Sequence, residues 1–331
     1  MKEYDVYAIG NALVDEEIEV ATESLRDLNI DKGVMTLVDE DKYLDLLKNM
    51  KGARHNRTCG GSAANTVIGL SCLGGSTFLS CKVSEDETGN FYYKNLKECG
   101  VNTNLNNGLE TTGKTGHCLV FITPDADRTM NTYLGITATF SKSELIEKEI
   151  VKSKYLYIES YLLTGPNGTE AAILACEIAR KNNVKVAITL SDPAIVEHFH
   201  TQILDVKGNQ KFDLIFCNED EAKMFTKTDN IDEAIQEMQS FTNDFVITRG
   251  SKGATIYNNN NLEIIETEAV KAIDTNGAGD LFAGAYLYGI TNGYSSKQSG
   301  ELACAASTKL VTKFGARLTE QELLKIKSEI K

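Results

Sequence analysis

Short apolar stretches alternate with longer amphipathic stretches along most of the chain, and this alternation constrains the fold more than any other feature of the sequence. The expected strands are rich in β-branched and aromatic residues and cover 6–9, 77–80, 155–158, 184–189, 212–216 and 244–248. Helical patterns follow several of them, at 61–73, 85–99 and 168–181. Strands that alternate with helices favour a parallel sheet with helices on both faces. The sequence therefore predicts an α/β fold with a mostly parallel central sheet.

Two stretches interrupt this alternation. Residues 16–38 and 116–134 alternate apolar and polar side chains without a helix of comparable length between their strands. The second stretch is typical of a hairpin with its turn at 124–127. We expect the two stretches to pair as a small second sheet outside the main one. Edge strands of the central sheet are the alternative.

The charge balance and the cysteines restrict the partners and the compartment. The chain has 34 Lys and Arg against 47 Asp and Glu, a net charge of −13. Such an acidic protein repels nucleic-acid phosphates, and it lacks the basic segment that attracts an anionic membrane surface. The charged start at 1–5 does not suit a signal peptide, and no apolar run reaches the ~18 residues of a membrane helix. Eight cysteines without a Cys-x-x-Cys pair are typical of reduced thiols. We therefore expect a cytoplasmic protein that binds neither nucleic acid nor membrane.

The segment 274–280, Asp-Thr-Asn-Gly-Ala-Gly-Asp, is the most informative about chemistry. It follows a strand-like stretch at 270–273 and precedes a helical one. Gly277 and Gly279 allow a ligand to approach a helix N-terminus, where free N–H groups stabilise an anion. Asp280 would face that anion, which suits a base that takes a proton from a hydroxyl attacking phosphorus. The alternative is that Asp280 only complements the helix dipole.

Four further polar or glycine-rich segments follow predicted strand ends. They are Gly10-Asn11 with Asp15, the segment 60–65, the segment 218–221 and the segment 248–253. Each has an ordinary structural explanation as a cap, a turn or tight packing. Ligands bind at this edge of open α/β sheets, so the joint occurrence favours a nucleotide-dependent phosphotransferase. The motifs of P-loop enzymes, dinucleotide-dependent oxidoreductases and triad hydrolases are missing from the sequence.

These segments resemble the PfkB carbohydrate kinase family, also called ribokinase-like, over nearly the whole chain. The two family signatures match Gly-Gly-Ser-Ala-Ala-Asn at 60–65 and the segment 274–280, where Asn276 replaces the threonine or small residue that is frequent in the family. The resemblance implies a three-layer α/β/α domain over 1–331 with a small β-sheet lid, its strands inserted from about 16–38 and 116–134. It also implies ATP and Mg²⁺ as cofactors.

The resemblance implies a catalytic role for five positions. Asp280 matches the general base that deprotonates a primary hydroxyl of the substrate. The backbone N–H groups of Gly277, Ala278 and Gly279 match the anion hole for the transferred phosphoryl group. Arg128 matches a lid arginine that approaches this group on closure.

The remaining matches are binding positions. Those expected to hold the substrate are Asn11, Asp15, Gly60, Gly61, Asn65 and Tyr161. Those expected to hold the nucleotide are Asn218, Thr248, Gly250 and Gly253. Glu221 and, through water, Asn218 match the positions that organise Mg²⁺, and the carbonyls of Asp274 and Asn276 match positions that can hold K⁺.

Within the family, the stretches 9–15 and 128–135 are similar to adenosine kinases. Tyr161 follows a strand at a place where its ring could stack on a purine, although it could equally pack in the core. We therefore expect ATP-dependent phosphorylation of the 5′-hydroxyl of a nucleoside, with adenosine converted to AMP. The alternatives are a kinase of a free sugar (ribose, fructose or 2-keto-3-deoxygluconate) and a nucleoside-binding protein without catalysis. The sequence is compatible with a monomer or with a homodimer formed through the lid.

Overall fold

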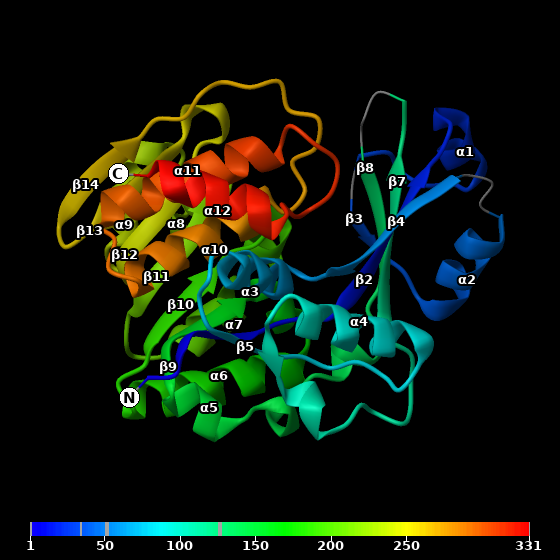
Figure 1. Cartoon of the computed structure of the whole chain (residues 1–331), viewed down its shortest axis with the longest axis horizontal. Coiled ribbons are helices and arrows are strands. Elements are labelled where there is room, and N and C mark those ends of the chain that lie inside the picture. The colour runs from blue at the N-terminus through cyan, green and yellow to red at the C-terminus, as the bar shows by residue number, and fades with distance from the viewer. Residues whose placement is uncertain (1, 34, 50–52, 125–127, 331) are drawn as a thin grey trace.

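The computed structural model describes residues 2–33, 35–49, 53–124 and 128–330, and within them the strands form two separate sheets. The large sheet has the order β14-β13-β12-β11-β10-β9-β1-β5-β6, and the small sheet has the order β3-β8-β7-β2-β4. Figure 1 shows the small sheet standing to one side of a larger body that carries both termini. This arrangement confirms the expected α/β fold with a second, smaller sheet.

The large sheet is mostly parallel, as the alternation of strands and helices predicts. Its strands are β1 (Tyr4–Ile9), β5 (Thr77–Ser80), β6 (Asn102–Thr103), β9 (Ser153–Glu159), β10 (Lys185–Thr189), β11 (Phe212–Asn218), β12 (Thr242–Thr248), β13 (Ala254–Asn258) and β14 (Asn261–Ile265). The pairs from β6 to β12 are parallel, and β12, β13 and β14 form an antiparallel edge. Because parallel strands share one direction, the carboxyl ends of β9 to β12 meet at one edge of the sheet.

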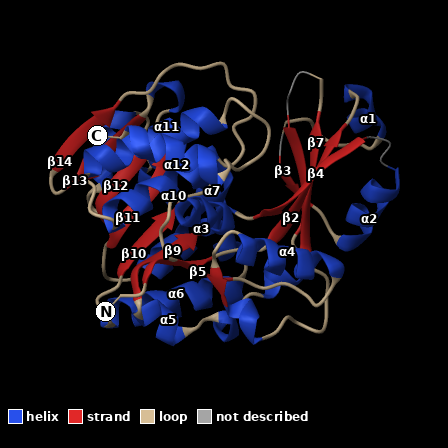
Figure 2. Ribbon diagram, in the orientation of Figure 1, coloured by secondary structure: helices blue, strands red, loops and turns tan. Residues whose placement is uncertain are grey.

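Helices cover both faces of this sheet (Figure 2). Successive strand residues point to opposite faces, so Val6 and Ala8 join one apolar core while Tyr7 and Ile9 join the other. The first core is completed by α3 (Ser62–Cys72), α4 (Glu87–Glu98), α10 (Ala278–Thr291), α11 (Ser296–Leu310) and α12 (Glu320–Glu329). The second is completed by α5 (Glu147–Val151), α6 (Pro166–Lys181), α7 (Pro193–Lys207), α8 (Glu219–Thr226) and α9 (Ile231–Met238). The fold is therefore a three-layer α/β/α arrangement.

The small sheet, which we call the lid sheet, has its own apolar core. Its strands are β2 (Leu13–Glu19), β3 (Met35–Leu37), β4 (Ala53–Gly60), β7 (Gly116–Ile122) and β8 (Arg128–Tyr133). The helices α1 (Thr22–Asp27) and α2 (Glu40–Asn49) pack Leu25 and Leu46 against Ile18 and Phe121 of the sheet. β7 and β8 form the expected antiparallel hairpin, while residues 125–127 of its predicted turn lie outside the described residues.

Two details differ from the expectations. The strand β4 lies outside the stretches 16–38 and 116–134. It was not predicted because its sequence is mostly polar and does not alternate. The prediction of a strand at 270–273 is wrong. Val270 and Ile273 are 38% exposed, and the N–H of Ile273 donates to the carbonyl of Val311 instead of a strand. The prediction relied on β-branched residues, which are frequent in strands but here lie in a partly exposed loop.

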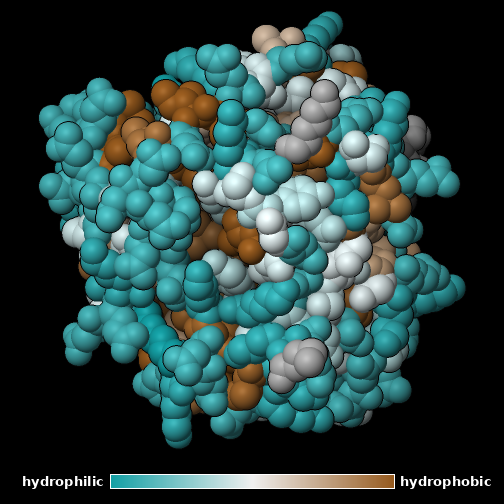
Figure 3. All heavy atoms as spheres, turned by 60° about the vertical axis from the view of Figure 1, so that its left-hand side comes forward, coloured by the Kyte–Doolittle hydropathy of each residue, from teal (hydrophilic) through white to brown (hydrophobic). Residues whose placement is uncertain are grey.

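The surface agrees with the composition. On the face shown in Figure 3, hydrophilic residues cover most of the molecule and apolar residues form separate small patches. None of the described helices is long and apolar enough to cross a membrane. All eight cysteines are free thiols, and most of them are buried.

Candidate active site

A cavity of about 490 Å³ lies between the carboxyl ends of the central strands and the inner face of the lid sheet. The large sheet contributes Glu159, Thr189, Asn218 and Thr248, which end β9, β10, β11 and β12. The lid sheet contributes strands β2, β3, β7 and β8. The sequence-predicted residues that line this cavity are Asn11, Asp15, Gly61, Asn65, Tyr161, Asn218, Glu221, Thr248, Asn276, Gly277, Gly279 and Asp280. The structure thus gathers most of the predicted site at one place.

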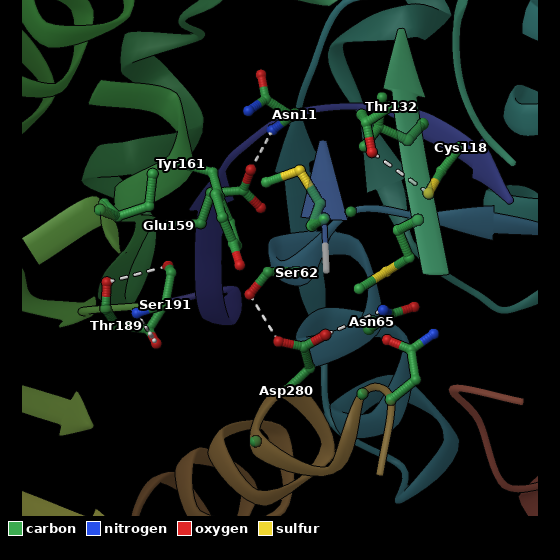
Figure 4. A pocket seen from close by; sticks show the side chains of 18 of the residues that line it. Asn11, Ser62, Asn65, Cys118, Thr132, Glu159, Tyr161, Thr189, Ser191 and Asp280 are labelled. Carbon is green, nitrogen blue, oxygen red and sulfur yellow. Dashed lines mark hydrogen bonds between the residues drawn. The ribbon is translucent and has the colours of Figure 1, made fainter. Parts of the chain in front are cut away.

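The carboxylate of Asp280 lies at the start of α10 and is held from α3 (Figure 4). Gly277 is the N-cap of this helix. Its φ of 73° favours glycine, and a Cβ there would lie 2.7 Å from the Cβ of Ala316. Ser62 Oγ donates to Oδ1 of Asp280 at 2.6 Å, and Asn65 Nδ2 donates to Oδ2 at 3.0 Å. Burial raises the pKa of Asp280, while these two hydrogen bonds lower it. The result is an oriented carboxylate suited to accept a proton.

A second carboxylate, that of Asp15, enters the cavity from the lid sheet. A side chain on Gly60 would collide with it, so the glycine makes room for Asp15 on the neighbouring strand. Burial raises the pKa of Asp15 to about 7, and the charge of Arg317 acts in the opposite direction. A carboxylate with unused lone pairs at a cavity wall can accept hydrogen bonds from substrate hydroxyls.

Glu159 is a site residue that sequence reasoning missed. Its two oxygens accept hydrogen bonds from the N–H groups of Asn11 and Ala63, each at 2.7 Å, and burial raises its pKa to about 7. Glu159 therefore ties the end of β1 to the start of α3. Since it directly follows the predicted strand 155–158, the rule that located the other segments could have found it.

Other polar lining residues also escaped the sequence analysis. They are Ser62, Thr132, Thr164, Thr189, Ser191 and Thr275. Thr189 and Ser191 lie at a predicted strand end, and Ser62 lies inside the first glycine-rich segment, so both places carried a signal. Thr132 lies within a lid strand, where nothing in the sequence distinguishes it from its neighbours.

Asn218 and Glu221 cap the start of α8 and also face the cavity. Asn218 Oδ1 accepts from the N–H of Glu221 at 2.8 Å, and Glu221 Oε2 accepts from the N–H of Asn218 at 3.1 Å. Burial raises the pKa of Glu221 to about 7, and the nearby carboxylates of Asp192, Asp220 and Asp280 raise it further. The structure therefore shows this pair as a helix cap that also lines the cavity, and its role in ligand binding stays a prediction.

These surroundings fit a divalent cation bound together with phosphates. An acidic corner with little compensating charge favours an incoming cation, and Mg²⁺ typically takes one or two carboxylates plus phosphate and water oxygens. Among the described residues there is no group of three or more His, Cys, Asp or Glu side chains that could hold a metal by itself. A site completed by phosphate oxygens needs no such group.

Six predicted residues, Asp274 among them, lie off the cavity wall. Gly60 is in a lid strand, and the N–H of Ala278 donates to the carbonyl of Thr275 at 3.2 Å. Gly250 and Gly253 belong to the turn between β12 and β13. Arg128 forms ion pairs with Glu17 at 3.1 Å and with Asp274 at 2.6 Å. Arg128 therefore joins the lid sheet to the segment that precedes α10.

A second cavity of about 580 Å³ adjoins the first and has a different character. The two share Asn11, Met35, Leu37, Leu134, Thr164 and Ile195. The second extends between β3 of the lid sheet and α7 and is mostly apolar, with Phe140, Leu162 and Phe199 in its wall. Met35, at 38% exposed, belongs to these cavity walls and is not a core residue.

Comparisons with known proteins agree with the geometry. The model described as pfkB family carbohydrate kinase matches residues 34–323. Adenosine kinase 2 of Arabidopsis thaliana is 25% identical over 95% of this chain and 95% of its own length. The 5-dehydro-2-deoxygluconokinase of Bacillus licheniformis is 25% identical over 94% of this chain and 91% of its own. The structure of adenosine kinase from Sinorhizobium meliloti matches with a TM-score of 0.89 and 28% identity, covering 98% of this chain and 99% of that chain. These matches confirm the ribokinase-like fold.

The pKa of Asp15 gives a testable dependence of stability on pH. Because its value of about 7 in the folded protein exceeds the usual 3.8, the native state binds more protons between these values and loses stability as pH rises through them. Above pH 7 the ionised Asp15 lowers the free energy of unfolding by roughly 2–3 kcal/mol, after allowance for solvent screening, and replacing Asp15 with Asn removes this penalty. We expect Asp15→Asn to raise the melting temperature over wild type more at pH 8 than at pH 5. Asp229→Asn, an exposed control with the same charge change, should show no such difference. Equal effects of Asp15→Asn at both pH values would contradict the assignment.

Proposed function

This chain belongs to the pfkB family of carbohydrate kinases, and we propose that it transfers the γ-phosphoryl group of ATP to the 5′-hydroxyl of a nucleoside, with adenosine as the preferred acceptor. The family fixes the reaction class, phosphoryl transfer to a hydroxyl group. Its relatives include an adenosine kinase and a sugar kinase at the same 25% identity, so similarity does not choose the acceptor. The choice rests on the shape and polarity of the site.

The observation that carries the proposal is the apolar cavity beside the carboxylates. Asp15, Asn65 and Asp280 offer the polar contacts that ribose hydroxyls require. The adjoining 580 Å³ cavity, walled by Leu162 and Phe199, offers the apolar surroundings that suit a nucleobase. A free sugar, polar on all sides, would leave this second cavity without a matching group.

The proposed chemistry needs few groups, and they lie in the first cavity. Asp280 takes the proton from the 5′-hydroxyl as the hydroxyl oxygen attacks the γ-phosphorus, the bond from this phosphorus to the β,γ-bridging oxygen breaks, and ADP leaves. Such a base typically contributes about 10²–10⁴ in rate. Negative charge that develops on the transferred group faces the N-terminal end of α10 at Gly277 and Gly279. The lid sheet covers the reacting groups, so that water does not compete with the acceptor.

The cavity wall at the ends of β11 and β12 suits the phosphates of ATP. Asn218, Glu221 and Thr248 line this wall, and the turn at Gly250–Lys252 follows β12 directly. We assign Mg²⁺ to Glu221 and, through water, to Asn218. When bound, the ion would neutralise charge on the phosphates. Arg128 lies beside the start of α10 at the junction with the lid, where the carboxylates of Glu17 and Asp274 balance its charge.

The acceptor can be identified from ADP release with Mg-ATP and a panel of compounds. The panel contains adenosine, guanosine, inosine, ribose, fructose, 2-keto-3-deoxygluconate and 5-dehydro-2-deoxygluconate. We expect adenosine to give the highest kcat/KM. Turnover of a free sugar without any response to adenosine would show that the chain is a sugar kinase. Binding of adenosine without ADP release would show a nucleoside-binding protein.

Replacing the base separates chemistry from binding. We expect Asp280→Asn to lower kcat by at least about 10², because the amide cannot take the proton, while the Kd for adenosine from calorimetry changes only a few-fold. Asp232→Asn is the matched control, since Asp232 lies in the first turn of α9 and is exposed. If Asp280 only complements a helix dipole, the two variants should behave alike, with about 0.3–1 kcal/mol of lost stability and normal turnover.

The apolar cavity can be tested on one helix. Ile195 of α7 lines both cavities, whereas its neighbour Val196 packs in the core of the large domain. We expect Ile195→Ala to raise the KM for adenosine by about tenfold or more, because a methylene lost from such a pocket is worth about 1–3 kcal/mol. Val196→Ala should lower stability and leave this KM unchanged. An unchanged KM in Ile195→Ala would show that the nucleobase of adenosine binds elsewhere.

A further inference from the structure

Arg317 lies behind the cavity wall, in the segment between α11 and α12, and none of the proposed roles uses it. Its Nε donates to Oδ1 of Asn65 at 3.0 Å, and its Nη1 donates to Oδ1 of Asn95 at 3.0 Å. Its Nη2 donates to the backbone carbonyl of Cys59. One partly buried guanidinium therefore connects α3, α4 and the lid strand β4.

The contact with Asn65 determines which way the amide of that residue points. A guanidinium has five N–H donors and no acceptor, so the Asn65 atom that faces it must be the oxygen. The amide nitrogen then faces the opposite way, toward Asp280, to which it donates at 3.0 Å. With the amide reversed, its nitrogen would oppose the guanidinium and its oxygen would oppose the carboxylate. Both contacts would then be repulsive.

From this geometry we infer that Arg317 is a positioning residue for the reaction, which fixes the Asn65 amide as a donor to Asp280 and places a positive charge behind this carboxylate. The inference rests on the proposed role of Asp280 as general base. Arg317 acts through the Asn65 amide and through its own charge, and it does not line the cavity.

The electrostatic surroundings show why such a charge is needed. The groups around the Asp280 carboxylate are mostly acidic or phenolic: Asp15 on β2, Tyr157 and Glu159 on β9, Tyr161 in the turn η4 (Ser160–Thr164) and Glu221 on α8. Against them, the charge of Arg317 lowers the pKa of Asp280 and also that of Asp15. Loss of this charge would leave two neighbouring carboxylates with less compensation in a buried place.

A purely structural role is the competing explanation, because the bonds to Asn95 and Cys59 also hold the segment in place. The two roles differ in what they predict for the titration of Asp280. Loss of a brace lowers stability but leaves the surviving carboxylate with its normal pKa. Loss of a positioning charge raises the pKa of Asp280, and does so partly through Asn65.

The test compares Arg317→Met, Asn65→Ala and the double variant. The acid limb of the kcat profile for adenosine phosphorylation reports Asp280 in the complex. A ¹³C NMR titration of the Asp280 carboxyl, assigned by its loss in Asp280→Asn, reports it in the ligand-free protein. We expect Arg317→Met to raise this pKa by about one unit, the usual effect of removing a nearby opposite charge. Arg317→Met should shift it less in the Asn65→Ala background, because part of the effect passes through the amide.

The controls separate charge from packing. Asn95→Ala removes one partner of Arg317 without touching Asn65, so the titration should stay at the wild-type value. Arg317→Lys keeps the charge and should restore most of the pKa. If Arg317→Met does not fold, Arg317→Gln replaces it, since it loses the charge but keeps a donor for the Cys59 carbonyl.

The outcome that overturns the inference is a lowered melting temperature with an unchanged titration of Asp280, or a shift as large in the Asn65→Ala background as in wild type. If the wild-type protein phosphorylates no acceptor, the proposed function fails. The NMR titration of the ligand-free protein still decides the role of Arg317 in that case.

Discussion

The contact between α3 and α10 is the constraint on which the site depends. The two helices approach closely because Gly284 of α10 lies against the backbone carbonyl of Thr66, where any side chain would force them apart. Their N-terminal ends therefore meet, and Ser62 and Asn65 reach the carboxylate of Asp280. Widening this contact would leave the carboxylate buried without its donors, which is costly in a place of low polarity. The orientation of the base is thus a consequence of helix packing.

The lid sheet is connected to the same point by two cations. Arg128 of β8 pairs with Asp274, directly before α10, and Arg317 donates to the carbonyl of Cys59 in β4. The lid also supplies Asp15 to the polar cavity and Met35 to the walls of both cavities. The position of the lid sheet therefore affects both the binding of the acceptor and the surroundings of Asp280. This arrangement suits a reaction in which the acceptor must be enclosed before the phosphoryl group moves.

The sequence predicts the fold well because the alternation of strands and helices is a local pattern that repeats along the chain. Most residues of the predicted site also line the cavity, since the carboxyl ends of parallel strands meet in space. The strand β4 could not be predicted, because pairing with β2 stabilises it in spite of its polar composition. The roles of Glu159 and Arg317 depend on partners far away in sequence, Ala63 and Asn65, which no local pattern reveals.

The most direct test of nucleoside phosphorylation is to identify the products by ³¹P NMR, in a reaction that contains the protein, Mg-ATP and adenosine. The account predicts that the γ-phosphate signal of ATP declines while ADP and a 5′-phosphomonoester of adenosine appear in equal amounts. Inorganic phosphate should stay at the level of the reaction without adenosine. Release of inorganic phosphate in place of AMP, or no consumption of ATP, would contradict the assignment of the two cavities to a nucleoside.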